Sequence, residues 1–330
     1  MKLFFLTTTL LFSANLLAAN IEQGDYKNRQ DVAIFIGNMV KQSDYSEQEL
    51  VDLFSSVKRQ THLFDRLDRP AEKTLEWHQY RRIFIKDSRI NQGIEFWRQH
   101  KQSLTAVSDK MGVPAEIIIA IIGVETFYGV YQGKDPVFDS LVTLAFDYPK
   151  RGGFFTQQLE HLLLLAKEQQ LNITALTGSY AGAMGMPQFI ASSYRHYAVD
   201  FDNDGRVDLF NSKPDIFASV ANYLVKHGWR TKQAIAGPLT VKATNSIAQL
   251  QPGVKTVYKW AELSQRGLLS NTPLAPDTPV ALIKLEQADH SEYWAGFENF
   301  YVITRYNHSE LYAMAVYQLS LLIKAGMSSS

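Results

Sequence analysis

One acidic residue near the end of an apolar run is the feature that most constrains this chain. The run is PAEIIIAIIGVETFYGV, residues 114–130. A helix through it surrounds Glu125, one turn away on either side, with Ile121, Ile122, Tyr128 and Gly129. Burying a carboxylate among such groups is costly unless it is paired or protonated. Glu125 is therefore either a structural accident at a helix end or a residue whose proton has a function.

The composition predicts a globular protein with a sizeable core. Apolar residues make up 46% of the 330 residues, which suits one large domain or two to three small ones. The 33 basic and 33 acidic residues balance, so we expect no nucleic-acid partner and no polybasic membrane patch. The aromatic content of 12% fits a carbohydrate-stacking groove, but an ordinary large core explains it more simply.

The N-terminus predicts export. Residues 1–19 combine a lysine, an apolar stretch from Leu3 to Leu17 and small residues at Ala18 and Ala19, as in a secretory signal peptide cleaved near Ala19. The sequence has no cysteine, which excludes disulfides, thiolate metal sites, cysteine nucleophiles and a lipid anchor on an N-terminal cysteine. We therefore expect a soluble periplasmic protein.

The pattern from about residue 28 to 112 is helical. Ser46 and Glu49 form a Ser-x-x-Glu cap, and residues 90–112 predict one long helix that ends at Gly112. Pro114 starts the helix that carries Glu125. Further helices are predicted in GFFTQQLEHLLLLAKEQQ, QFIASSYRHYAV and DIFASVANYLVKHGW.

After Trp229 the pattern changes to that of a small β insert, from 232 to about 300. TPVALIKLE (278–286) and ENFYVITRY (298–306) alternate as strands do. The final segment, SELYAMAVYQLSLLIKAG, returns to helix.

The acidic loop DFDNDGRVDLFNSKPD, residues 200–215, matches the first half of an EF-hand calcium loop. Asp200, Asp202 and Asp204 alternate before a glycine, and Arg206 would offer its backbone carbonyl. The twelfth position holds Asn211 instead of a bidentate glutamate, so Asp215 would have to close the site. An Asx-rich surface turn is the alternative. We favour Ca²⁺ in a stabilising role.

The segment TGSYAGAMGMPQF, residues 177–189, is rich in small residues. Close approach of the backbone to a ligand and close helix packing explain it equally well. It is no nucleophile elbow, because Thr177 and Ala181 stand where Gly-x-Ser-x-Gly needs glycines. The eight histidines show no metal-ligand spacing, so no transition-metal site is predicted.

A glycosidase needs a carboxylic acid that stays protonated near neutral pH, and an apolar helix end would raise the pKa of Glu125 accordingly. Ordinary hydrolysis also needs a second carboxylate. Asp135, Asp139 and Asp147 are candidates, but nothing singles one out. From the residues alone, the catalytic and structural interpretations of Glu125 both stay open.

Four long segments together resemble the B-type lytic murein transglycosylases, in the same order, from about residue 28 to 325. They are GVETFYG, GSYAGAMGMPQFIASSYRHYAVDFDNDGRVDLF, SVANYLVKHGW and NFYVITRYNHSELYAMAVYQL. The resemblance implies a mainly α (α+β) fold: a lysozyme-like helical core with an EF-hand-like loop, an N-terminal α domain and a small β insert. The implied division is 20–105 for the α domain, 106–231 for the core, 232–299 for the insert and 300–330 for a segment returning to the core.

The resemblance also implies the reaction. The family cleaves the β-1,4 bond between N-acetylmuramic acid and N-acetylglucosamine in peptidoglycan. One glutamate, here Glu125, acts as acid and then as base, while the muramoyl C6 hydroxyl attacks C1 and leaves a 1,6-anhydro end. An internal nucleophile removes the need for a second carboxylate. A muramidase that uses water and a non-catalytic peptidoglycan-binding scaffold are the alternatives.

Residue by residue, the resemblance places glycan contacts and basic residues as follows. The glycan contacts fall on Ser179, Gln188, Tyr223, Tyr306, Asn307 and Tyr312, and the basic residues that meet a peptide stem or sugar acid fall on Lys150 and Arg151. Core packing is the alternative for Tyr223 and Tyr312, and we expect it for at least one of them.

For calcium, the resemblance implies Asp200, Asp202, Asp204, the carbonyl of Arg206 and Asp215, with no organic cofactor. The sequence departs from the family in two ways. The stretch from Arg206 to Asp215 is one residue longer than expected, and the lipobox cysteine of anchored members is absent. The expected partners are peptidoglycan strands and proteins of cell-wall synthesis or remodelling, and the expected state is a monomer.

Overall fold

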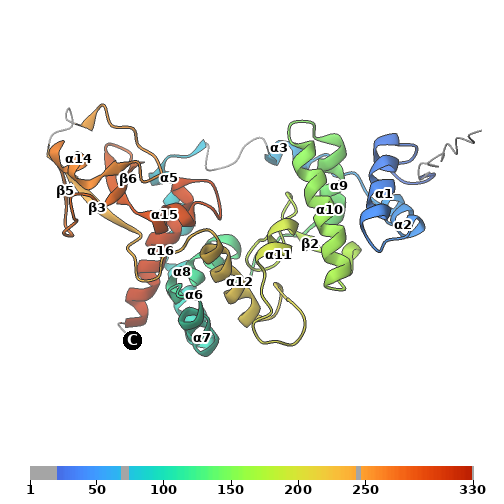
Figure 1. Ribbon diagram of the computed structural model, residues 1–330, viewed down its shortest axis with the longest axis horizontal. Coiled ribbons are helices and arrows are strands. Elements are labelled where there is room, and N and C mark those ends of the chain that lie inside the picture. The colour runs from blue at the N-terminus through green and yellow to red at the C-terminus, as the bar shows by residue number, and fades with distance from the viewer. Residues whose placement is uncertain (1–20, 68–73, 243–246, 329–330) are drawn as a thin grey trace, which may run out of the picture. The chain divides into compact units, whose positions relative to one another are not determined.

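The computed structural model describes residues 21–67, 74–242 and 247–328, and its chain divides into two compact units after Arg59. The predicted signal peptide, residues 1–19, lies outside the described residues. In both units helices dominate, and the second unit also contains a small sheet (Figure 1). The predicted mainly α class is therefore confirmed, whereas the finer division at 105, 231 and 299 stays a prediction.

The first unit contains α1 (Gln30–Gln42) and α2 (Glu47–Ser56). The predicted cap of α2 is confirmed: the Ser46 hydroxyl accepts from the Glu49 amide at 3.2 Å, and Glu49 accepts from the Ser46 amide at 2.7 Å. The two helices pack through Phe35 and Phe54, whose ring centroids are 5.8 Å apart.

The second unit is built mainly from helices (Figure 1). They are α3 (Leu63–Leu67), α5 (Trp77–Phe84), α6 (Asp87–Gln99), α7 (Lys101–Met111), α8 (Ala115–Thr126), α9 (Val137–Asp147), α10 (Gly152–Glu168), α11 (Ala191–Tyr197), α12 (Lys213–Lys226), α15 (Glu298–Ile303) and α16 (Glu310–Ser328). Pro114 precedes α8 as its N-cap, as predicted. All residues from Ile117 to Val124 are buried, because α6, α7, α12 and α16 pack around this apolar helix.

The single helix predicted for residues 90–112 is wrong, because two helices meet at His100. The backbone of His100 leaves the helical region (φ −114°, ψ 19°), and its ring packs at 4.6 Å against Phe96 and at 5.9 Å against Phe217. The break lets α6 pack on α16 while α7 packs on α12. The predicted end at Gly112 is confirmed, since its left-handed backbone (φ 69°) caps α7.

The β insert is an antiparallel sheet with its own core. Its strands are β3 (Ala236–Val241), β4 (Tyr258–Lys259), β5 (Leu268–Ser270), β6 (Pro279–Glu286) and β7 (Ser291–Gly296), in the order β4-β6-β7-β3-β5, with α14 (Trp260–Gln265) beside them. The strand predicted at 278–286 is confirmed as β6. Leu263, Leu268, Val280 and Leu282 lie in its buried core.

The strand predicted at 298–306 is wrong, because this segment forms α15 and a following turn. Its buried residues Asn299, Phe300, Val302 and Ile303 follow helical spacing, so one helix face is covered. The buried Asn299 side chain accepts from the amide of Arg230 and donates to its carbonyl, both at 2.8 Å, which fixes the helix start.

A short two-stranded sheet includes the start of the Gly-rich segment. It pairs β1 (Asp135–Pro136) with β2 (Thr177–Gly178). Among the described residues, no helix is both long and apolar enough to cross a bilayer.

Candidate active site

A groove of about 1290 Å³ in the second unit contains the predicted acid residue. Six parts of the chain line it: residues 67 and 75–77 before and at the start of α5, the end of α8, the residues just before α10, the Gly-rich segment, the β insert, and the stretch from α15 to α16. The β insert contributes Lys255, Lys284 and Glu286. The groove thus lies between the helical core and the small sheet, with both acidic and basic side chains on its walls.

The end of α8 is fixed by the residue that follows Glu125. Thr126 is 1% exposed, and its hydroxyl oxygen lies 2.9 Å from the carbonyl oxygen of Met186 and accepts from the amide of Gly129 at 3.0 Å. Phe127 and Tyr128 then take left-handed backbone conformations (φ 51° and 61°), which turn the chain away sharply. The helix end that carries Glu125 is therefore tied to the Gly-rich segment.

Glu125 is oriented by a tyrosine from the C-terminal helix. The Tyr312 hydroxyl donates to Oε1 of Glu125 at 2.6 Å, and the Tyr312 side chain is only 2% exposed. Burial and the nearby Glu125 carboxylate raise the pKa of Tyr312 well above its usual value. The hydroxyl therefore stays protonated and acts as a fixed donor beneath Glu125.

Two more tyrosines extend this arrangement. The Tyr306 ring is stacked on Tyr312 with centroids 6.3 Å apart, and its hydroxyl donates to the carbonyl of Pro187 at 2.7 Å. Burial and the Glu125 charge raise the pKa of Tyr306 well above its usual value. Tyr223 lies 4.9 Å from the Tyr306 ring, is stacked on His227 and donates to the carbonyl of Arg305. Burial raises the pKa of Tyr223 to about 12.

The Gly-rich segment folds onto itself. A Cβ at Gly178 would lie 2.2 Å from the carbonyl oxygen of Ala183, and one at Gly185 (φ 69°) would lie 2.5 Å from that of Leu209. These two glycines therefore allow backbone contacts within the protein. The Ser179 hydroxyl accepts from the Ala183 amide at 3.0 Å and so stabilises the turn.

Gln188 holds the same segment against the loop after α8. Its backbone is left-handed (φ 52°), and its amide donates to the carbonyls of Gly185 at 2.9 Å and Gln132 at 3.1 Å. Because Nε2 is engaged with the protein, the carbonyl end of the side chain is the part suited to accept from a ligand.

The two predicted basic residues lie at the start of α10. Lys150 Nζ is 6.0 Å from the Tyr148 ring centroid, and the Arg151 guanidinium is 4.4 Å from that of Phe154. Both side chains line the groove. Within the part of the chain that the structure describes, no carboxylate forms an ion pair with Arg151.

Six of the predicted active-site residues line the groove together: Glu125, Lys150, Arg151, Gln188, Tyr306 and Asn307. The other three, Ser179, Tyr223 and Tyr312, are not among the residues that line the groove. Tyr312 is packed in the core, as expected for at least one tyrosine.

The sequence analysis did not single out two further residues. Thr126 directly follows Glu125, and Tyr180 lines the groove with the Arg66 guanidinium 4.4 Å from its ring centroid.

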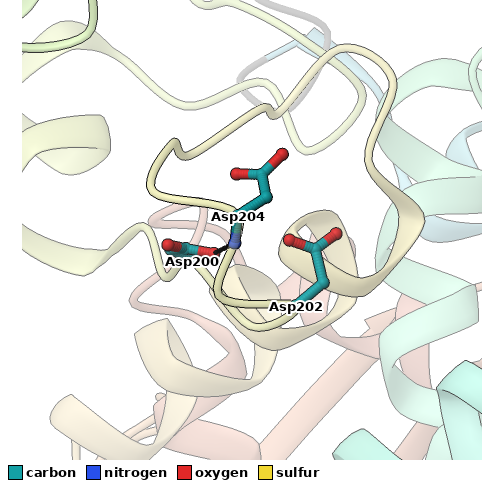
Figure 2. A group of neighbouring side chains, drawn as sticks. All are labelled: Asp200, Asp202 and Asp204. Carbon is teal, nitrogen blue, oxygen red and sulfur yellow. Dashed lines mark hydrogen bonds between the residues drawn. The ribbon is translucent and has the colours of Figure 1, made fainter.

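The acidic loop brings three aspartates together. One carboxylate oxygen each from Asp200, Asp202 and Asp204 can be chosen so that the three lie within 4.8 Å of one another. Figure 2 shows the three side chains on one turn of the loop. Asp200 accepts from the amides of Asp204 at 3.2 Å and Gly205 at 3.0 Å, which shapes the turn. Gly205 has φ 90°, a conformation that glycine allows. Three clustered hard oxygen ligands fit a calcium ion.

Asp215 lies apart from this group of three. It is 1% exposed, and its two oxygens accept from the amides of Phe201 at 2.7 Å and Asp208 at 3.0 Å. Burial raises the pKa of Asp215. Asp215 therefore holds Phe201, near the start of the loop, and Asp208, in its middle, to the start of α12. Its role as a calcium ligand stays a prediction. Asp208 was missed: it occupies the ninth loop position and accepts from Asn211.

Comparisons with known proteins agree with this architecture. The family model described as a transglycosylase SLT domain matches residues 27–321. Membrane-bound lytic murein transglycosylase B of Escherichia coli is 39% identical over 305 residues, which cover 90% of this chain and 83% of that protein.

Two solved structures are similar over most of the chain. The E. coli lytic transglycosylase Slt35 in complex with calcium is 37% identical and covers 95% of this chain and 98% of its own, with a TM-score of 0.87. SltB3 of Pseudomonas aeruginosa in complex with NAG-anhNAM-pentapeptide is 27% identical and covers 89% and 79%, with a TM-score of 0.77. The expected lysozyme-like core is thereby confirmed, and the chain belongs to the lytic transglycosylase family, whose transglycosylase SLT domain accounts for nearly its whole length.

Proposed function

We propose that this lytic murein transglycosylase cleaves the β-1,4 bond between N-acetylmuramic acid and N-acetylglucosamine in peptidoglycan and forms 1,6-anhydromuramoyl ends. The main support for this proposal is the position of Glu125. Its side chain lines the groove, and its Oε1 accepts a hydrogen bond from the Tyr312 hydroxyl at 2.6 Å. A related enzyme has been solved with NAG-anhNAM-pentapeptide, a compound that combines the glycan, the anhydro ring and a peptide.

In the proposed reaction, Glu125 acts first as an acid. It transfers its proton to the glycosidic oxygen, so the bond between muramoyl C1 and that oxygen breaks and N-acetylglucosamine leaves with a free 4-hydroxyl. Glu125 then acts as a base and takes the proton of the muramoyl C6 hydroxyl while O6 bonds to C1. Glu125 is protonated again at the end, and no water is consumed.

The groove residues support this chemistry by position. The Tyr312 hydrogen bond fixes the Glu125 side chain, so its proton is presented in one direction. We propose that Gln188, Tyr306 and Asn307 contact the glycan directly, because all three line the groove. Ser179 and Tyr223 are not among the residues that line the groove, so they would act by holding the Gly-rich segment and Tyr306 in place.

Lys150 and Arg151 are proposed to bind carboxylates of the substrate. The lactyl group and the peptide stem of peptidoglycan carry such groups, and a guanidinium can bind a carboxylate through two parallel hydrogen bonds. The aromatic rings of Tyr148 and Phe154 beside these cations limit their conformations and so lower the entropy lost on binding.

Calcium is proposed as a structural ion of the acidic loop. Asp200, Asp202, Asp204 and the carbonyl of Arg206 would hold it, with Asp215 closing the loop beneath them. The bound ion would neutralise three close carboxylates, whose mutual repulsion otherwise opposes the loop conformation. A related enzyme has been solved in complex with calcium.

We also propose that the protein is located in the periplasm, because residues 1–19 have the pattern of a secretory signal peptide.

The Glu125→Gln variant tests the assignment. It should bind purified peptidoglycan as well as the wild type does and release no soluble fragments. Wild-type turnover in this variant would contradict the role of Glu125. A wild-type protein that binds but never cuts would instead be a peptidoglycan-binding scaffold.

A further inference from the structure

Glu310 is a second carboxyl group on the wall of the same groove. It is the first residue of α16, two positions before Tyr312, and it lines the cavity that also contains Glu125. Its side chain is half-buried, and burial raises the pKa of its carboxyl group. The proposed reaction leaves Glu310 without a role.

The groove contains four glutamates, and three of them have partners inside the protein. Glu125 accepts from Tyr312 at 2.6 Å. Glu286 is paired with Lys284 and accepts from Ser291, both at 2.6 Å. Glu76 lies 3.4 Å from His78 at the start of α5. For Glu310, the described part of the chain supplies neither a hydrogen bond nor an ion pair to the carboxyl group.

A half-buried carboxyl group without a partner costs folding free energy, so its presence needs a reason. A general stabilising role at the N-terminus of α16 is one reason, since an acidic residue there interacts favourably with the helix dipole. That role does not require burial in the groove. A ligand in the groove that offers hydrogen-bond donors would supply the missing partner.

We infer that the carboxyl group of Glu310 accepts a hydrogen bond from the glycan that lies across Glu125, from a sugar hydroxyl or an acetamido N–H. The inference rests on the proposed function and adds a substrate-binding residue to it. A sugar donor fits better than a charged amine of the peptide stem, because the surroundings of Glu310 disfavour its ionised form. Its neighbours Asn307 and Ser309, which also line the groove, are themselves neutral hydrogen-bonding residues.

Kinetics of matched variants test this inference. Glu310→Ala removes the acceptor, whereas Glu310→Gln keeps a carbonyl oxygen in its place. Glu160→Ala removes a glutamate of α10 outside the groove and serves as the control. Each is assayed on intact peptidoglycan and on glycan strands stripped of peptide, and each is checked by its thermal unfolding midpoint.

For Glu310→Ala we expect KM to rise about tenfold on both substrates, as expected for one lost hydrogen bond, with kcat nearly unchanged. Glu310→Gln should recover most of the loss. Wild-type kinetics for Glu310→Ala would overturn the inference. A loss confined to peptide-bearing substrate would also overturn it and point to an amine of the stem.

Binding separates this inference from the proposed function. Titration calorimetry compares the affinity of Glu125→Gln for the trimer of N-acetylglucosamine with that of the double variant Glu125→Gln/Glu310→Ala. Weaker binding by the double variant supports the inference even if the wild type releases no fragments, a result that would refute the proposed function alone. Equal affinities would refute the inference whatever the turnover.

Discussion

The Tyr312 hydroxyl and Oε1 of Glu125 are 2.6 Å apart in space and 187 positions apart in sequence. The C-terminal helix α16 thus completes the site that α8 begins. A hydrogen bond contributes about 0.5–1.5 kcal/mol when both groups are neutral and about 1.5–3 kcal/mol when one is charged, so losing this one should be measurable in the rate.

Tyr312→Phe should lower kcat at least about tenfold, because Glu125 loses the donor that fixes its orientation. Steady-state assays on purified peptidoglycan measure this. Tyr317→Phe is the matched control, since it removes a hydroxyl from the same helix that donates instead to Ala236, outside the groove. If the two variants are equally active, the Tyr312 contact has no role in catalysis.

Thr126→Val should lower the free energy of unfolding of the second unit by about 1–3 kcal/mol. Valine keeps the shape of the side chain but removes the buried hydroxyl, so the Met186 carbonyl and the Gly129 amide lose their hydrogen-bond partner. Urea unfolding followed by tryptophan fluorescence measures the change. Thr156→Val is the control, since that hydroxyl bonds only within α10, to the carbonyl of Gly152. An unchanged midpoint for Thr126→Val would show that the tie to the Gly-rich segment contributes no stability.

Arg151→Gln should raise KM for peptide-bearing peptidoglycan about tenfold, because a charged hydrogen bond to a carboxylate of the peptide stem is lost. Stripped glycan strands, whose only carboxylates are the freed lactyl groups, should be unaffected. The comparison of the two substrates is the measurement. Equal losses on both would mean that Arg151 contacts the sugar or shapes the start of α10 instead.

Calcium should raise the thermal unfolding midpoint of the wild type, because an ion that binds the folded state alone stabilises it by mass action. At a hundredfold excess over Kd the gain is about 2.7 kcal/mol. Asp202→Asn should remove most of this gain, whereas Asp109→Asn, on the exposed face of α7, should keep it. A chelator that leaves the wild-type midpoint unchanged would refute the calcium site.

Local pattern was enough to predict α8, the cap at Ser46 and the cluster of aspartates in the acidic loop. Each depends on residues a few positions apart, whose spacing fixes the geometry. The alternating pattern in residues 298–306 wrongly predicted a strand. The burial of Asn299 and its hydrogen bonds to the backbone of Arg230 favour a helix there over the local strand propensity. The break at His100 likewise follows from packing on two different helices.

The wall of the groove could not be predicted from spacing. Glu310 and the β-insert residues Lys255 and Lys284 line the same groove as Glu125, although they lie far from it in the sequence, and α16 packs against α8. The pairing of Tyr312 with Glu125 has the same origin. The family resemblance identified Tyr312 as a candidate site residue, but its hydrogen bond to Glu125 is known only from the structure.

Mass spectrometry of the fragments released from purified peptidoglycan by residues 20–330 tests the central claim most directly. The account predicts muramoyl ends lighter by one water than reducing ends, since the C6 hydroxyl closes the ring and water takes no part. Muramoyl ends of full mass would mean that water attacks C1, and the protein would then be a muramidase on the same fold.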